Sequence, residues 1–262
     1  MTDTHIHLDG PEFDADRDEV VARAREAGIS RMFIPAIDLK TVDSVLDVCR
    51  RYPGYAYPML GLHPEEVRAD WREVLDAIHS RLVQADVLAQ TIAVGEVGID
   101  YYWSREFEHE QLEAFEEQVR WAVELQLPLM IHCRKGQQEL VRILHRYEKD
   151  LVGGVFHCFT GNEKEAAELL AFDRFVLGIG GVLTFKKSHL PEVLAAAVPL
   201  TRVVLETDAP YMAPVPKRGQ RNESAFVPWV LQRMAESYGV SADEVERQTE
   251  ENVRRVFQKV RL

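Results

Sequence analysis

The chain lacks long hydrophobic segments and has few cysteines. No apolar run approaches the ~18 residues that a membrane-spanning helix needs, so we expect no transmembrane segment. The three cysteines, Cys49, Cys133 and Cys158, are an odd number without the spacing of a zinc site. They argue against a disulfide framework and favour reduced thiols in the cytoplasm. The N-terminus lacks the basic and apolar stretches of a secretory leader, so none is expected.

Basic residues are outnumbered by acidic ones. The 262 residues include 31 Lys and Arg against 43 Asp and Glu, which gives a formal net charge of −12. This balance excludes a chain-wide electrostatic attraction to nucleic acid or to an anionic membrane, so any phosphate binding must be local. With no linker or low-complexity tract, the composition predicts one globular domain over residues 1–262. Nothing in the sequence points to an obligate protein partner.

Short β-rich runs alternate with amphipathic segments along the whole chain. The eight expected strands span residues 2–8, 31–37, 56–62, 91–97, 128–133, 153–158, 174–180 and 202–206. The expected helices span residues 16–27, 41–52, 70–88, 106–125, 137–149, 163–171 and 190–197, with a final pair at 225–238 and 242–259. This alternation predicts an α/β protein with parallel strands, and eight units in about 250 residues favour a (β/α)₈ TIM barrel. A doubly wound open sheet is the alternative.

Six imidazole and carboxylate groups fall at the carboxyl ends of these strands. They are His5, His7, Glu96, His132, His157 and Asp208. Two of them, His5 and His7, lie two positions apart in a predicted strand, so their side chains leave the same face. Because the carboxyl ends of barrel strands converge on one opening, we expect all six groups to share a cavity.

The chemistry of these groups predicts a metal site. Nitrogen and oxygen ligands without thiolate suit hydrolytic divalent metals such as Zn²⁺, Mn²⁺ or Mg²⁺. Six groups exceed what one tetrahedral ion uses, so we expect two divalent metal ions with Glu96 between them. Cys133 and Cys158 each follow a proposed ligand by one position, and strand alternation therefore turns them toward the helical layer as small core residues.

Seven sequence strings, in order along nearly the whole chain, resemble the TatD-family metal-dependent hydrolases. They are DTHIHLDG from Asp3, GLHP from Gly61, GEVGIDYY from Gly95, LPLMIHCR from Leu127, GVFHCFTG from Gly154, LETDAPYMAP from Leu205 and GQRNE from Gly219. The resemblance implies a TIM barrel, a divalent metal site and deoxyribonuclease activity, often as a 3′–5′ exonuclease. By matching motif, it implies that the six strand-end groups are the metal ligands and that His63 and Glu206 border the site.

The chain departs from the family pattern at two places. Ser224 stands where members often have proline after the Asn-Glu pair, which predicts a looser entry into the following helix. Lys135 and Gly136 stand where an acidic residue and an alanine are frequent. The second difference bears on substrate preference and leaves the metal chemistry unchanged.

Four side chains are candidates for catalysis. Asp208 is expected to orient and deprotonate the attacking water, and Glu96 to hold the two ions together. His63 either donates to a phosphate, protonates the leaving alkoxide, or is a structural loop histidine. Glu206 is expected to orient one of the ligands from behind.

Basic side chains gather in the loops after the fifth, seventh and eighth strands. They are Arg134, Lys135, Lys186, Lys187, Lys217, Arg218 and Arg221. The candidates for binding substrate are Arg134, Lys135, Arg221 and Asn222. The aromatic residues at 101–103 either stack on a base or pack beneath their loop. The expected substrate is DNA, as single strands or as strand ends.

Other functions remain open. An amidohydrolase-like enzyme that cleaves C–N or ester bonds uses a similar barrel, but many such sites bridge their ions with a carboxylated lysine from strand four. That strand has Glu96 and no lysine here. A D-aminoacyl-tRNA deacylase would use the same phosphate-binding loops. A non-catalytic metal-binding interaction module is disfavoured because every expected ligand is present.

Overall fold

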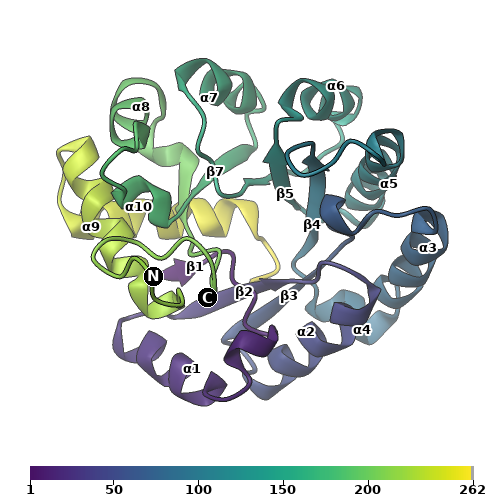
Figure 1. Ribbon diagram of the computed structural model, residues 1–262, viewed down its shortest axis with the longest axis horizontal. Helices are drawn as coiled ribbons and strands as arrows, with labels where there is room; N and C mark the ends of the chain where they lie inside the picture. The colour runs from purple at the N-terminus through teal and green to yellow at the C-terminus, as the bar shows by residue number, and fades with distance from the viewer. Residues whose placement is uncertain (261–262) are drawn as a thin grey trace.

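Eight parallel strands form a barrel with helices on its outside in the computed structural model, which describes residues 1–260 (Figure 1). The strands are β1 (Thr2–Asp3), β2 (Arg31–Pro35), β3 (Ala56–Leu60), β4 (Ala93–Asp100), β5 (Leu129–Arg134), β6 (Gly154–Phe156), β7 (Phe175–Ile179) and β8 (Val203–Leu205). Each strand pairs with the next one in sequence. This order confirms the TIM barrel, and the doubly wound sheet is wrong because such a sheet reverses its strand order.

Helices cover the outside of the barrel. The α-helices are α1 (Arg17–Glu26), α2 (Leu39–Arg51), α3 (Trp71–Leu82), α4 (Ala85–Gln90), α5 (Glu108–Leu125), α6 (Gln137–Tyr147), α7 (Glu163–Leu170), α8 (Leu190–Ala197), α9 (Val227–Tyr238) and α10 (Ala242–Val256). Short 3₁₀ helices are η1 (Pro11–Phe13), η2 (Pro64–Glu66), η3 (Gly181–Thr184), η4 (Leu200–Arg202) and η5 (Ser224–Phe226). The expected single helix over 70–88 is wrong, because Gln84 takes an extended backbone (φ −61°, ψ 131°) between α3 and α4.

The barrel closes where the first and last strands meet. β1 is shorter than the sequence predicted, but the chain beyond it stays beside the end of β8. The backbone N–H of Thr4 donates to the carbonyl of Leu205 (3.1 Å), and that of His7 donates to the carbonyl of Ala209 (2.9 Å). Ile6 also bridges Ala209 in parallel. Segments about 200 residues apart in sequence therefore lie side by side at the site.

Two hydrophobic layers support the barrel. The larger one fills the space between strands and helices and includes Met32 and Ile34. Phe33, between them, points the opposite way and belongs to a second layer inside the barrel. The ring of Phe257, just after α10, packs against that of Phe33 with centroids 4.7 Å apart. The end of α10 thus contributes to the apolar layer inside the barrel.

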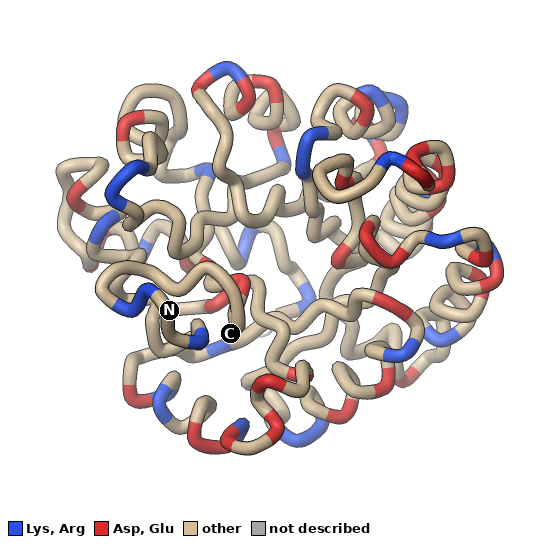
Figure 2. The backbone as a smooth tube through the Cα atoms, viewed as in Figure 1, with Lys and Arg blue, Asp and Glu red and all other residues tan. Residues whose placement is uncertain are grey.

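Charge on the outer surface is mixed in sign. Acidic and basic residues are interspersed over the surrounding helices and loops (Figure 2). Among residues 1–260, no helix combines the length and apolarity needed to cross a bilayer.

Candidate metal centre

Strand alternation places two of the predicted ligands directly beyond the apolar interior of the barrel. His132 comes two residues after the buried Met130 of β5, and His157 comes two residues after the buried Val155 of β6. Because strand side chains two positions apart point the same way, both histidines face the interior. The same apolar layer supports the site from below.

Glu96 reaches this layer because β4 is irregular. Ala93 belongs to the interior layer, so strict alternation along the strand would also turn Val97 inward. The register of β4 against β5 shifts between Val94 and Val97, and Val97 packs in the outer layer instead. The shift gives Glu96 the inward position, where its side chain is 2% exposed.

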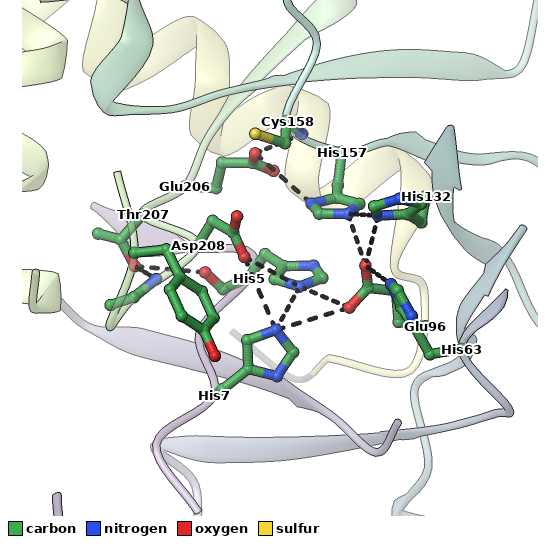
Figure 3. Close-up of polar contacts among 12 residues, drawn as sticks. His5, His7, His63, Glu96, His132, His157, Cys158, Glu206, Thr207 and Asp208 are labelled. Carbon is green, nitrogen blue, oxygen red and sulfur yellow. Dashed lines mark hydrogen bonds and ion pairs between the residues drawn. The ribbon is translucent and has the colours of Figure 1, made fainter. Parts of the chain in front are cut away.

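One oxygen of Glu96 faces the ligands from the two chain segments that close the barrel. Its Oε2 lies 3.1 Å from Nε2 of His5 and 3.6 Å from Nε2 of His7. Oδ1 of Asp208 lies 3.8 Å and 3.7 Å from the same two nitrogens. Asp208 takes a left-handed backbone (φ 54°), and its N–H donates to the carbonyl of His5 at 2.9 Å. Figure 3 shows this group on one side of Glu96.

The other oxygen of Glu96 faces three further histidines. Its Oε1 lies 2.7 Å from Nε2 of His157, 3.1 Å from Nδ1 of His132 and 3.1 Å from Nε2 of His63. These side chains come from segments following β6, within β5 and following β3, and they converge in Figure 3. The structure therefore brings all six predicted ligands and His63 together around one carboxylate.

Asp100 is a member of the cluster that the sequence reasoning missed. Its Oδ2 lies 2.8 Å from Nε2 of His132, and its Oδ1 accepts the backbone N–H of Tyr102 at 2.8 Å. A side chain at Gly98 would overlap the carbonyl oxygen of His132, so this glycine lets β4 approach β5 closely. The signal was available, since Glu96, Gly98 and Asp100 alternate along one strand.

The polar atoms of the cluster are better arranged to bind divalent cations than to form hydrogen bonds with one another. Oε2 of Glu96 is buried, and no hydrogen bond reaches it within residues 1–260. Nε2 of His5 lies 3.4 Å from Nε2 of His7, and Nδ1 of His132 lies 3.3 Å from Nε2 of His157. Converging imidazole nitrogens beside a buried carboxylate are the donor set of a nitrogen- and oxygen-ligated metal.

The surroundings shift the pKa values of these groups. Burial lowers the pKa of His5 to about 4, and the nearby His157 acts in the same direction. Burial alone would raise the pKa of Glu96, but His157 and the other histidines hold it well below its usual range. Burial opposes protonation of His132, yet Asp100 and Glu96 raise its pKa to about 10. Metal binding must displace this proton, so metal affinity should weaken as the pH falls.

Glu206 lies behind the cluster. It is fully buried, and its Oε1 accepts the backbone N–H of Cys158 and lies 3.9 Å from Nδ1 of His157. Burial raises the pKa of this carboxyl to about 8. Cys158 is half-buried in the turn after β6, whereas Cys133 packs against the outer hydrophobic layer. The burial of Glu206 and its contacts with the Cys158 backbone and with His157 support a positioning role for this carboxylate.

The four candidate substrate-binding residues separate in the structure. Arg134 lines the cavity above the cluster, and Lys135 lines a neighbouring cavity. Arg221 instead forms a two-pronged ion pair with Asp16 (2.7 and 2.8 Å). Asn222 is fully buried and donates its amide to the carbonyls of Thr207 and Tyr211. The structure therefore does not bring Arg221 or Asn222 to the cavity, and both hold the loop after β8.

The cavity measures about 680 Å³ and opens directly over the cluster. Six of the clustered groups line it, namely His7, His63, Glu96, His132, His157 and Asp208. Trp103, Tyr211 and Met212 are large exposed side chains at its edge. The volume suits one nucleotide-sized ligand.

A TIM barrel with histidines and carboxylates gathered at the carboxyl ends of its strands defines the class of metal-dependent hydrolases. A family model described as "TatD related DNase" matches residues 2–258, and the chain belongs to this family.

Similar proteins cover the whole chain. An uncharacterized metal-dependent hydrolase, YabD of Bacillus subtilis, is 32% identical over 257 residues, covering 98% of each chain. The 3′-5′ ssDNA/RNA exonuclease TatD of Cronobacter sakazakii is 36% identical over 265 residues, covering 99% of this chain and 98% of its own. The crystal structure of YJJV, a TatD homolog from Escherichia coli, superposes with a TM-score of 0.90 at 29% identity, covering 98% of each chain.

Proposed function

We propose that this chain is a 3′–5′ exonuclease that hydrolyses phosphodiester bonds at the ends of single-stranded DNA with two divalent metal ions. The names of its relatives support the reaction and its direction. The two-metal part of the proposal rests on Glu96, whose two carboxylate oxygens face different histidines. Oε2 of Glu96 faces His5, and Oε1 faces His157. Zn²⁺, Mn²⁺ and Mg²⁺ are the candidate ions.

Each of the two groups of candidate ligands would hold one ion. His5, His7 and Asp208 would hold one ion together with Glu96, and His132 and His157 would hold the other with the same carboxylate. Bound ions would lower the pKa of a water molecule to about 7 and polarise a phosphoryl oxygen. Burial would raise the pKa of Asp208, but His7, His157 and His5 together outweigh burial and lower that pKa. The ionised carboxylate can orient the water and accept its proton.

His63 is suited to donate a hydrogen bond to the substrate. Its Nδ1 accepts the backbone N–H of Glu65 at 3.1 Å, so the proton of the neutral ring is on Nε2. That nitrogen lies 3.1 Å from Oε1 of Glu96, in the wall of the cavity. We assign His63 to bind a phosphate oxygen or protonate the leaving oxygen rather than to ligate metal.

The hydrolysis of C–N or carboxylic ester bonds is not favoured. β4 carries Glu96 and contains no lysine that could be carboxylated to bridge two ions. Seven curated relatives at 32–36% identity are named 3′-5′ ssDNA/RNA exonucleases. A D-aminoacyl-tRNA, the substrate of a deacylase, is therefore the second substrate to test rather than the first.

A panel of substrates tests this proposal. Purified protein with added Mg²⁺, Mn²⁺ or Zn²⁺ would be given single-stranded DNA, a D-aminoacyl-tRNA and a simple lactone in parallel. We expect rapid release of nucleotides from DNA and no comparable turnover of the other two. Faster hydrolysis of the aminoacyl ester or the lactone than of DNA would contradict the proposed function.

The cysteines bear on where the protein works. All three are free thiols, with Cys49 buried and the other two half-buried. Unpaired cysteines are typical of a reducing compartment. We propose the cytoplasm.

A further inference from the structure

Two large aromatic side chains project from the loop between β4 and α5. Trp103 is 69% exposed and Tyr102 is 44% exposed, whereas Tyr101 beside them is buried. The rings of Tyr102 and Trp103 meet edge to face with centroids 4.8 Å apart. Trp103 is the most exposed large apolar side chain within residues 1–260. Tyr101 packs beneath the loop, so Trp103 and Tyr102 are free for another role.

A cationic side chain lies against these rings. The Cζ atom of Arg134, the last residue of β5, lies 3.5 Å from the centroid of Tyr102 and 5.6 Å from that of Trp103. Nζ of Lys135 lies 5.1 Å from the centroid of Tyr102. Within the described residues, the guanidinium of Arg134 makes no ion pair or hydrogen bond, so its donors are available to an anion. The stacking holds it in place before any ligand arrives.

This group stands at the edge of the metal cavity. Trp103 and Arg134 both line it, and Arg134 is the only Lys or Arg among its lining residues in the described chain. Trp103 also borders a smaller pocket of about 280 Å³. Arg134 borders the neighbouring cavity that contains Lys135. A strand leaving the metal cavity over this edge would cross the aromatic rings.

We propose that Trp103, Tyr102 and Arg134 form a stacking subsite for the nucleobase that adjoins the cleaved phosphate on the strand that is kept. This inference rests on the proposed nuclease function. The terminal nucleotide occupies the cavity, Arg134 binds a phosphate oxygen, and the base of the second nucleotide lies on the indole of Trp103. Every base has a π-face, so the subsite tolerates any sequence. A base inside a duplex has both faces covered, so the subsite favours single strands.

The test removes either the indole or the base. Trp103→Ala removes the platform, Trp103→Phe keeps an aromatic ring, and Trp229→Ala is the control, because Trp229 is 45% exposed on α9 and does not line the cavity. An oligonucleotide with a base-less tetrahydrofuran residue at the second position from the 3′ end removes the partner. Affinity is measured by fluorescence anisotropy in chelator, where no cleavage occurs, and KM and kcat are measured with metal. Thermal melting checks that each variant is folded.

We expect Trp103→Ala to weaken binding and raise KM by roughly five- to hundredfold, with little change in kcat. Trp103→Phe should retain most of the affinity, and Trp229→Ala should match the original protein. The base-less substrate should cause a similar loss with the original protein and little further loss with Trp103→Ala. This lack of additivity is the signature of a direct stack.

Two outcomes would overturn the subsite. In the first, a folded Trp103→Ala protein binds the normal strand as tightly as the original. In the second, the losses from Trp103→Ala and from the missing base multiply in full, which would mean that they do not contact each other. If the original protein binds but does not cleave DNA with any metal, the nuclease function fails while the binding measurement still decides the stack.

Discussion

Nε2 of His132 lies 2.8 Å from Oδ2 of Asp100, four residues beyond Glu96 on β4. This contact leaves Nδ1 of His132 pointing at Oε1 of Glu96, 3.1 Å away. A carboxylate behind a metal-binding histidine fixes the tautomer and the orientation of the ring. We therefore propose that Asp100 is a positioning residue for the candidate metal centre.

Replacing Asp100 by asparagine should weaken metal binding. The Asp100→Asn variant keeps the size of the side chain but removes the charge that aligns His132. We expect metal affinity, measured by calorimetric titration, to fall about 10- to 100-fold, and high metal concentrations to restore part of the activity. Asp150→Asn, at an exposed site after α6, is the matched control. Unchanged affinity in Asp100→Asn would remove its positioning role.

The sequence could predict that the six candidate ligands converge, because barrel topology brings strand ends together whatever the length of the chain between them. Asp100 escaped because the predicted fourth strand ended at residue 97, whereas β4 continues to Asp100. Gly98 lies within β4, where a glycine is needed because β5 passes so close to it. Two-residue alternation from Glu96 would have identified Asp100.

The Asp208→Asn variant tests whether Asp208 acts in the chemical step rather than in folding. The amide keeps the shape but cannot accept a proton from water, so kcat should fall about 100- to 10,000-fold with DNA affinity largely kept. Single-turnover kinetics measure the rate of the chemical step, and fluorescence anisotropy measures the DNA affinity. Near-normal turnover would contradict the assignment of Asp208 as the base. Glu206, which is buried behind His157, would then be the next candidate.

Metal should stabilise the fold through Glu96. A divalent ion at about 100 times its Kd adds about 2.7 kcal/mol, which raises the melting temperature of a chain of this size by roughly 5 to 10 °C. The Glu96→Gln variant loses the carboxylate that both groups of histidines share, so its melting temperature should rise by less than about 2 °C. Scanning calorimetry with and without metal measures both. An equal rise in the two proteins would show that Glu96 does not hold the ions.

The positions of the candidate substrate-binding residues were harder to predict than those of the candidate ligands. Arg221 follows a barrel strand and resembles a phosphate-binding residue, but its partner Asp16 lies 205 positions earlier in the chain. The side-chain amide of Asn222 donates hydrogen bonds to two carbonyls of its own loop. A loop has no fixed period, so the sequence does not tell which of its polar side chains faces the cavity. Arg134 was expected in the loop after the fifth strand, but it is the last residue of β5 and lines the cavity.

Binding should depend weakly on salt. With Arg134 as the one cationic side chain described in the cavity lining, we expect two or three phosphate contacts. A slope of about −0.7 per contact predicts that raising salt from about 50 to 200 mM weakens binding roughly tenfold. Arg134→Gln should reduce the slope by about one contact, whereas Arg142→Gln on the exposed side of α6 should not. A slope steeper than about −4 would indicate a long basic groove instead.

The most direct test of the account is digestion of two single-stranded DNA molecules by metal-stripped protein to which metal is returned. One is linear and labelled at its 5′ end, and the other is a closed circle. We expect no cleavage in chelator and, with Mg²⁺, Mn²⁺ or Zn²⁺, a ladder in which the linear strand shortens from its 3′ end one nucleotide at a time while the circle stays intact. Full activity in chelator would contradict the metal centre around Glu96, and efficient cutting of the circle would contradict the recognition of strand ends.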